Sequence, residues 1–180
     1  ANVQVTVNNE AQATTSQTSQ SMSNAAAVAT GATNASTTGQ QNGQGIEASI
    51  KWQAANQLNL EINYSYIDAT DIDNIEVANI PKNQYYAAVN WQISDKWQLH
   101  TRINSVTDRI RKVTDPRKKI ADQKITNVKI QRNNLVPDLN LALIINNVFN
   151  ENARDPSNGS IVEDYPLTGR QVIVELSYKF

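Results

Sequence analysis

The basic residues between residues 108 and 122 are the first candidates for binding chemistry. They stand against three aspartates in the same stretch, and they are Arg109, Arg111, Lys112, Arg117, Lys118 and Lys119. Clustered positive charge attracts anions from a distance and raises their local concentration. The stretch could therefore attract an anionic ligand or contact a phosphate-bearing surface, or it could be a solvated loop without a ligand.

An acidic group earlier in the chain offers oxygen ligands. Its members are Asp68, Asp71, Asp73, Asn74 and Glu76. Hard cations such as Ca²⁺ take several oxygen ligands, but the central glycine of an EF-hand loop is missing here. We therefore predict no metal site and no cofactor, and Asp68, Asp71, Asp73 and Glu76 are the residues at which a metal would have to bind.

The single histidine, His100, is the remaining candidate for catalysis. A hydrolase needs a histidine within reach of a nucleophile and of an acid that orients it. Ser105 is near in sequence, but an odd number of positions separates the two, so on a strand their side chains point to opposite faces. We predict no enzymatic activity. A formal net charge of -1 and the absence of cysteine also argue against a nucleic-acid partner and against thiol chemistry.

Alternation of apolar and polar residues with period two recurs along the chain and predicts about eight β-strands. The alternating segments begin near Val3, Ile46, Leu58, Tyr85, Trp97, Thr126, Leu139 and Val172. Most are near the ~9–11 residues that a tilted strand needs to cross a bilayer, whereas no apolar run is long enough for a membrane-spanning helix. The expected fold is all-β, a segment of a transmembrane antiparallel β-barrel.

The connections between these strands alternate in length. Short ones lie at 54–57, 94–96 and 133–138, and long ones at 9–42, 68–83, 108–122 and 150–168. Outer-membrane barrels have short periplasmic turns and longer extracellular loops, whereas a soluble β-sandwich has no reason to sort its loops in this way. Residues 9–42 are low in complexity and rich in small polar residues, which predicts a flexible extracellular loop.

Large aromatic residues provide a second test of this topology. In the apolar phase, tryptophans flank the short connections and tyrosines lie toward the long ones: Trp52, Trp91, Trp97, Tyr64, Tyr66 and Tyr85. Two belts of amphipathic rings are expected where a barrel wall crosses the two membrane interfaces. We therefore expect the apolar phase to contact lipid and polar residues such as His100 to line the lumen.

The last predicted strand ends in an alternating run with an aromatic final residue. Its apolar positions are Val172, Val174, Leu176, Tyr178 and Phe180. The run resembles the C-terminal signal that the barrel-assembly machinery recognises in bacterial outer-membrane proteins. Physically, an extended strand with one apolar face can add to the edge of a sheet. We therefore expect the barrel-assembly machinery to be a partner.

Further segments narrow the resemblance to one family. Residues 139–150, LNLALIINNVFN, are similar to the penultimate strand of TonB-dependent receptors, with Asn146-Asn147-Val148-Phe149-Asn150 in place of their Asn-Asn-Leu-Phe-Asp-like ending. Residues 164–170, DYPLTGR, resemble the Pro-x-x-Gly-Arg sequence that leads into the family's final strand. Residues 79–84, NIPKNQ, also look like this family. Their order and spacing resemble the C-terminal end of a TonB-dependent outer-membrane receptor.

The resemblance implies that residues 1–180 form one β-barrel domain, an open part of a barrel of about 22 strands with a plugged lumen. The plug and the TonB-contacting box are expected outside this chain. The resemblance also implies the outer membrane of a Gram-negative bacterium, with membrane lipid and lipopolysaccharide as surroundings. The implied function is import of a ferric siderophore or similar scarce nutrient, driven by the TonB system through the plug. On the extracellular side of such a barrel, the basic residues between 108 and 122 could attract an anionic iron chelate or contact the phosphates of lipopolysaccharide. No residue here specifies the substrate.

Two other functions remain open at the level of the residues. A self-contained eight-stranded outer-membrane barrel, acting as a structural anchor or adhesin, would suit a chain of this length. An outer-membrane hydrolase would have to use His100. A hydrogen-bond ladder between Val3–Asn8 and Val172–Phe180 would favour the small barrel, while terminal strands that stay apart would favour the larger receptor.

Overall fold

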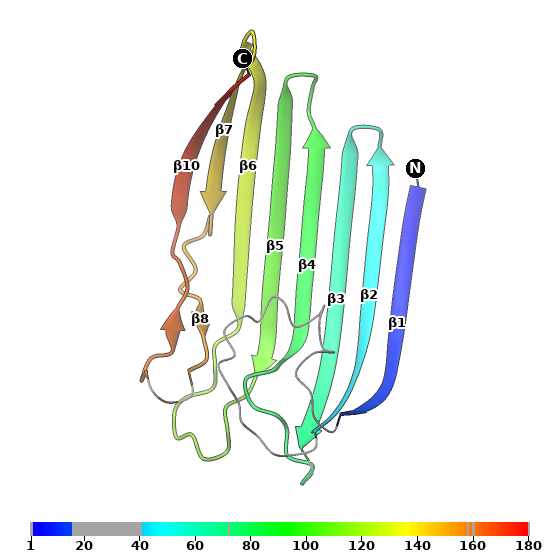
Figure 1. The fold of residues 1–180 in the computed structure, drawn as a ribbon, viewed down its shortest axis with the longest axis vertical. Coiled ribbons are helices and arrows are strands. Elements are labelled where there is room, and N and C mark those ends of the chain that lie inside the picture. The colour runs from blue at the N-terminus through cyan, green and yellow to red at the C-terminus, as the bar shows by residue number, and fades with distance from the viewer. Residues whose placement is uncertain (1, 16–40, 72, 158, 160, 180) are drawn as a thin grey trace.

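The chain forms strands joined by turns and loops in a computed structural model, which describes residues 2–15, 41–71, 73–157, 159 and 161–179 (Figure 1). The long strands are β1 (Asn2–Thr15), β2 (Gln41–Ala55), β3 (Leu58–Asp71), β4 (Pro81–Gln92), β5 (Trp97–Arg109), β6 (Gln123–Val136), β7 (Leu139–Asn146) and β10 (Gln171–Tyr178). Two short strands, β8 (Arg154–Asp155) and β9 (Tyr165–Pro166), pair with each other. Within the described residues, no helix has the length and apolar character needed to cross a membrane.

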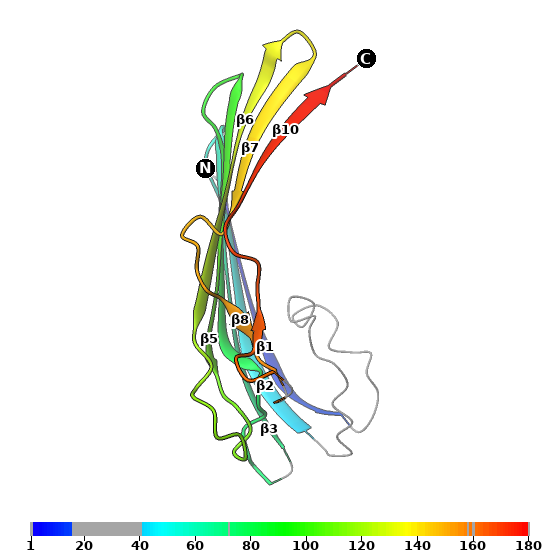
Figure 2. The same cartoon turned by 90° about the vertical axis from the view of Figure 1, so that its left-hand side faces the viewer.

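The large sheet has eight strands in the order β1-β2-β3-β4-β5-β6-β7-β10. All neighbouring strands pair antiparallel. The sheet is a single bent layer (Figure 2). In the described chain β1 and β10 stand at opposite ends of this order and do not pair with each other. The predicted all-β antiparallel sheet is confirmed, and these strands do not close into a small eight-stranded barrel.

Connection length distinguishes the two ends of the sheet (Figure 1). The short turns after β2, β4 and β6 lie at one end, the upper end in Figure 1, and the loops after β3, β5 and β7 lie at the other. We term these the short-turn end and the long-loop end. The strands extend further than predicted, since β1 continues to Thr15 and β2 begins at Gln41. The rest of the predicted loop over 9–42, residues 16–40, lies outside the described residues.

Cross-strand register aligns the two phases of the strands into rows. One row consists of Trp52, Leu60, Val89, Thr101, Val128, Ile145 and Val172. The adjacent row consists of Gln53, Asn59, Asn90, His100, Lys129, Ile144 and Ile173. Because successive side chains of a strand point to opposite faces, the sheet has one apolar face and one mainly polar face. That lipid contacts the first and the lumen the second remains a prediction.

A single layer of this kind has little interior. Among the described residues, the buried apolar side chains are small or lie in loops: Ala88, Ile120, Ala142 and Ala153. On the apolar face, by contrast, Ile62 is 53% and Val174 is 63% exposed. An apolar surface left open in this way is what a barrel wall offers to lipid. The sheet thus holds the long loops at one end, and its apolar and polar faces lie between that end and the short turns.

Candidate functional site

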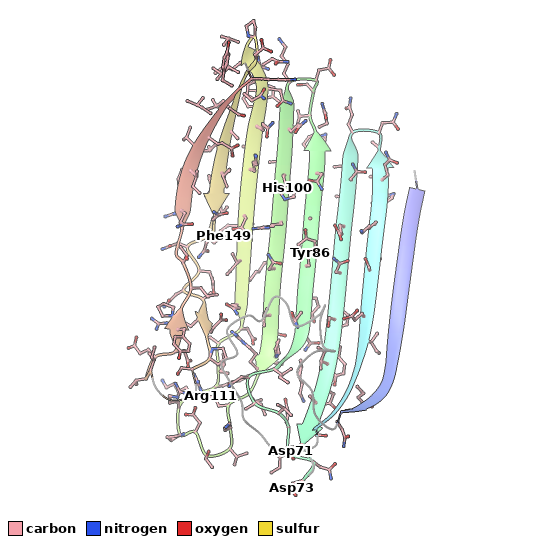
Figure 3. All side chains as sticks on the ribbon, viewed as in Figure 1. Asp71, Asp73, Tyr86, His100, Arg111 and Phe149 are labelled. Atoms are coloured by element: carbon pink, nitrogen blue, oxygen red, sulfur yellow. The ribbon has the colours of Figure 1, made fainter. Side chains whose placement is uncertain are left out.

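The basic loop between β5 and β6 lies at the long-loop end, where Figure 3 labels Arg111. Two of its arginines point toward the loop between β7 and β10. Arg111 donates two hydrogen bonds to the carboxylate of Asp164, one of them at 2.9 Å, and another from Nε to the carbonyl of Lys118 at 2.7 Å. Arg117 donates to Asp115 at 2.6 Å and to Asp164 at 3.1 Å. These guanidinium groups therefore join two loops that are distant in sequence.

Asp164 is at the centre of this arrangement and is only 6% exposed. It also accepts hydrogen bonds from the backbone amide and the hydroxyl of Ser157, at 3.0 and 3.3 Å. The hydrogen bond from Arg111 holds the pKa of Asp164 well below its usual range, and the hydrogen bond from Arg117 lowers the pKa of Asp115 to about 2. Two cations and two anions thus compensate one another. Arg111, Asp115, Arg117, Ser157 and Asp164 are termed the loop lock.

Arg109 makes a second connection between the same two loops. It ends β5, is 4% exposed and forms an ion pair with Asp155 at 3.3 Å. It also donates hydrogen bonds to the carbonyls of Ala121 at 3.3 Å and Arg154 at 3.2 Å. Because Arg154 and Asp155 form β8, this contact holds the small β8–β9 sheet against the basic loop. All three arginines predicted to contact a ligand are therefore engaged inside the molecule.

The lysines of the basic loop keep their charge at the surface. Lys112 and Lys118 are exposed and form no ion pair within the described part of the chain. Lys119 is 62% exposed and reaches Asp108 at 3.5 Å. The hydrogen bond from Arg111 to the Lys118 carbonyl brings the backbone beside Lys112 close to Lys118. The positive surface open to an external anion thus consists of Lys112, Lys118 and Lys119.

The acidic loop between β3 and β4 lies at the long-loop end, where Figure 3 labels Asp71 and Asp73. Its carboxylates bind groups within the fold. Asp71 accepts hydrogen bonds from two backbone amides of the following turn, that of Asp73 at 3.0 Å and a second at 2.9 Å. Asp68 and Glu76 both face the ammonium group of Lys82, at 3.8 and 3.1 Å. Across the described residues, no group of three acidic, histidine or cysteine side chains is arranged to hold a metal ion.

The polar face has a hollow of ≈ 230 Å³ toward the short-turn end, and His100 lies in its wall. The polar side chains around it include Asn59, Asn90, Gln92, Gln98, Lys129 and Gln131. Nδ1 of His100 is hydrogen bonded to the amide oxygen of Asn90. Ser105 pairs with Tyr85 in the other phase, so it lies on the opposite face. His100 is thus surrounded by amides suited to hydrogen bonding, not by a nucleophile and an orienting acid.

The three tryptophans lie at the short-turn end in one phase of the sheet. Trp52, Trp91 and Trp97 are between 42% and 44% exposed. The guanidinium carbon of Arg132 lies 5.3 Å from the ring centroid of Trp97, its cross-strand partner. A cation over an indole face is attracted by the negative potential of the ring. This arrangement is compatible with an interfacial belt, which remains a prediction.

The predicted tyrosine belt lies in the same phase, toward the long loops. Tyr64 and Tyr85 are cross-strand partners whose ring centroids are 5.0 Å apart. The hydroxyl of Tyr64 donates a hydrogen bond to the side-chain oxygen of Asn83 at 2.7 Å. Asn83 is in turn the cross-strand partner of Tyr66. The three rings are therefore grouped at one height of neighbouring strands.

The last strand, β10, carries four of the five predicted signal residues, while Phe180 lies outside the described residues. Val172, Val174, Leu176 and Tyr178 are between 56% and 65% exposed. Within the described chain β10 pairs with β7 on one side and with no strand on the other. One edge of β10 and its apolar face are thus open to a partner. Its role as an assembly signal remains a prediction.

The two segments that resemble receptor motifs meet at the junction between β7 and β10. Asn147, 2% exposed, donates hydrogen bonds from Nδ2 to the carbonyls of Glu151 at 2.9 Å and Thr168 at 3.3 Å, and its Oδ1 accepts the Glu151 amide at 2.8 Å. Asn150 Oδ1 accepts the backbone amide of Arg170 at 3.0 Å. Asn147, Asn150, Thr168 and Arg170 are termed the strand clasp.

The partners that give these sites their geometry could not be read from the sequence. The arginines stand out there, but Asp155, Ser157 and Asp164, which lie one long loop further along the chain, do not. The only available signal was an excess of arginine in one loop and of unassigned aspartate in another. Such a balance of charge does not show which side chains meet.

An antiparallel sheet with one apolar face, one polar face and loops sorted by length is typical of the wall of an outer-membrane β-barrel. Residues 3–148 match the family described as TonB dependent receptor-like, beta-barrel. The chain belongs to this family of Gram-negative outer-membrane proteins, which are transport receptors and not enzymes. A search of curated proteins gives no match.

Solved structures of outer-membrane receptors share the fold at low sequence identity. The ferric yersiniabactin uptake receptor FyuA from Yersinia pestis is 18% identical with a TM-score of 0.66, over 79% of this chain and 24% of that one. The ferripyoverdine receptor of Pseudomonas aeruginosa is 15% identical with a TM-score of 0.64, over 82% and 21%. The copper transporter OprC is 14% identical with a TM-score of 0.63, over 79% and 24%. The chain thus spans about a quarter or less of each receptor.

Proposed function

We propose that the complete protein imports a metal chelate, in the first place a ferric siderophore, across the outer membrane with energy from the TonB system. The observation that supports this most is the family match over residues 3–148. Two of the similar structures are described as a ferric yersiniabactin uptake receptor and a ferripyoverdine receptor, and a third as a copper transporter. A metal is common to the three descriptions, so iron chelates are the first substrates to test and copper the second.

The surface lysines Lys112, Lys118 and Lys119 could help to attract the transported compound. Many metal chelates are anionic, and a fixed group of cations at the outer end of a barrel would raise their encounter rate. The loop lock supports this role because it holds the basic loop in place beneath Lys112 and Lys118. Lipopolysaccharide phosphates would be attracted by the same charge and are the alternative partner.

Transport is tested with the full-length protein in a strain that lacks its own receptors for ferric chelates. We expect uptake of radioactive iron from at least one ferric siderophore, and loss of this uptake when TonB is deleted. Copper complexes are measured in parallel. Absence of uptake for every iron chelate, in cells whose outer membrane contains the assembled protein, would contradict the siderophore proposal.

The contribution of the lysines is tested by replacing Lys112, Lys118 and Lys119 with glutamine. The association rate of the transported chelate should fall a few-fold at low salt and change little at high salt, because salt screens exposed charges. Lys96→Gln, in the short turn after β4, is the control and should leave the rate unchanged. An unchanged rate with weaker lipopolysaccharide retention would assign the lysines to the lipid.

A further inference from the structure

The register of the last strand is poorly specified by its own residues. β10 pairs with β7 over eight residues, and its apolar positions face Leu139, Leu141, Leu143 and Ile145. A shift by one residue would turn these positions to the polar face, but a shift by two would keep every apolar residue on the apolar face. The aliphatic side chains of the two strands differ little in size, so the pattern alone does not exclude such a shift.

The connection between the two strands does not fix the register either. Tight turns set register through their geometry, and such turns join β2 to β3, β4 to β5 and β6 to β7. Residues 147–170, by contrast, separate β7 from β10. An ion pair links Lys129 of β6 to Glu175 of β10 at 3.8 Å, but the two side chains are 35% and 51% exposed. Exposed ion pairs of this kind contribute little to the free energy of folding, so this one holds the register only weakly.

The strand clasp lies where a constraint on register is needed. Arg170 directly precedes β10, and its backbone amide is bound by Asn150. Asn147 directly follows β7, and its side chain binds the carbonyl of Thr168. A shift of β10 by two residues would move Thr168 and Arg170 by about 6–7 Å along the strand. Both hydrogen bonds would then be lost, and Asn147 would be left buried with an unpaired donor.

Further contacts hold the clasp itself in place. The backbone amide of Asn147 donates to the side chain of Asn127 in β6 at 2.9 Å, which connects the clasp to a third strand. Asn147 and Asn150 adopt φ values of +51° and +55°, where asparagine is enriched among the larger residues. A Cβ on Gly169 would lie 3.2 Å from Oδ1 of Asn150, so glycine leaves room for this acceptor.

We propose that the strand clasp fixes the register of β10 against β7 and thereby sets the height at which the free edge of β10 meets its next partner. That partner is an antiparallel strand of the same polypeptide outside this chain. Three observations support it: the sheet is open, β10 is paired on one side only within the described chain, and this chain covers only 24% of a similar receptor. The proposal holds for any transported compound, since it concerns assembly and not the ligand.

Disulfide cross-linking in the full-length protein, assembled in outer membranes, measures the register directly. The 180 residues contain no cysteine, and any cysteine elsewhere in the protein is replaced by serine. Ile144→Cys with Ile173→Cys reports the native register, because these residues are cross-strand partners. Ile144→Cys with Glu175→Cys or with Gln171→Cys reports a shift by two residues in either direction.

The clasp is broken by replacing Asn147 and Asn150 with alanine. The ratio of shifted to native cross-links should rise by about tenfold or more, since two hydrogen bonds of ordinary net strength are lost. Asn146→Ala is the matched control, because this neighbouring asparagine has a side chain without a hydrogen bond among the described residues. It should leave the ratio unchanged. An unchanged ratio in the double variant would overturn the proposal, even if less protein were assembled.

A double variant that does not assemble is resolved by rescue. The Ile144→Cys, Ile173→Cys disulfide holds the native register without the clasp, and neighbouring strands have the Cα separation that a disulfide accepts. If register is the defect, the disulfide restores the heat-modifiable, membrane-embedded protein, and reduction during assembly abolishes the rescue. Continued failure to assemble with the disulfide in place would show that the clasp does not act by fixing the register of β10, and it would overturn the proposal.

Discussion

At the short-turn end, a few residues join neighbouring strands, and the ladder of backbone hydrogen bonds continues almost into each turn. At the long-loop end, by contrast, side chains join segments that are far apart in sequence. The contrast is clearest between Trp97 and Asp164. Trp97 opens β5 and contacts Arg132 on the adjacent strand. Asp164 binds Arg111 and Arg117 from another loop. The first end depends on local pairing, and the second depends on a small number of charged side chains.

This difference predicts different responses to substitution. A change on the strands should affect the stability of the whole sheet according to the face on which it lies, because lipid and water solvate charge very differently. A change in the loop lock should affect only the two loops that it connects. The variants below separate these two kinds of response.

The largest effect is expected for a charge on the apolar face near the middle of β3. Ile62→Arg should lower the free energy of unfolding in lipid by about 2–4 kcal/mol, as expected for arginine near the bilayer midplane. Asn63→Arg, one position along on the polar face, is the matched control and should be much milder, since Glu61 is nearby to accept the cation. Folding titrations in lipid vesicles measure both. Equal losses would show that the faces are assigned wrongly.

A smaller and local effect is expected when the loop lock loses its central carboxylate. Asp164→Asn removes the charge shared by Arg111 and Arg117, at a cost of about 1.5–3 kcal/mol for hydrogen bonds to charged groups. Amide hydrogen exchange should speed up in both loops and stay unchanged in the short turns. Glu163→Gln is the control, since Glu163 is 79% exposed. Faster exchange at both ends of the sheet would contradict the division between them.

A weaker effect still is expected at the short-turn end from the contact between Arg132 and Trp97. Arg132→Gln should lower stability by about 0.5–1 kcal/mol, the range for exposed cation–π pairs. Arg132→Lys keeps a cation and should recover part of the loss. Urea titration of the folded protein in lipid measures the difference. A loss larger than that of Asp164→Asn would reverse the order proposed for the two ends.

The smallest effect is expected from moderate acid. The pKa values of Asp115 and Asp164 are depressed in the fold by hydrogen bonds from Arg117 and Arg111. Such groups stabilise the fold above their unfolded pKa of ~4, and this contribution is lost as the pH falls toward the folded values. Hydrogen exchange of the two loops, corrected for the intrinsic rate, should therefore stay constant from neutral pH to ~4.5. Loop opening above pH ~5 would contradict the charged state of the lock.

The strands could be predicted from sequence because a half-exposed strand repeats every two residues, as around Leu58 and Tyr85. The strand ends in the loops could not, since β1 and β2 continue through polar residues as far as Thr15 and Gln41. β8 and β9 have two residues each and are too short for any periodicity. The burial of side chains in the site could not be predicted either. An arginine is usually exposed, but Arg109 is buried against its partners on β8.

The clasp was visible in the sequence only as two separate motifs. Residues 146–150 and 164–170 indicated the family, but their spacing along the chain gave no reason to expect hydrogen bonds between them. The structure supplies that reason, since β7 and β10 pair antiparallel and so bring the end of one strand beside the start of the other. Asn147 and Thr168 become neighbours through sheet topology.

The short final strands give the wall an uneven resistance to mechanical force. β7 and β10 have eight residues each, whereas β6 has 14. Toward the long-loop end, β6 is therefore flanked by a loop, which contributes the backbone hydrogen bond from the Val148 amide to the Thr126 carbonyl instead of a full ladder. A force applied to the C-terminus would load few backbone hydrogen bonds at once. In single-molecule pulling, β10 and β7 should therefore detach at a lower force than the hairpin of β2 and β3. The sheet should separate first between β6 and β7.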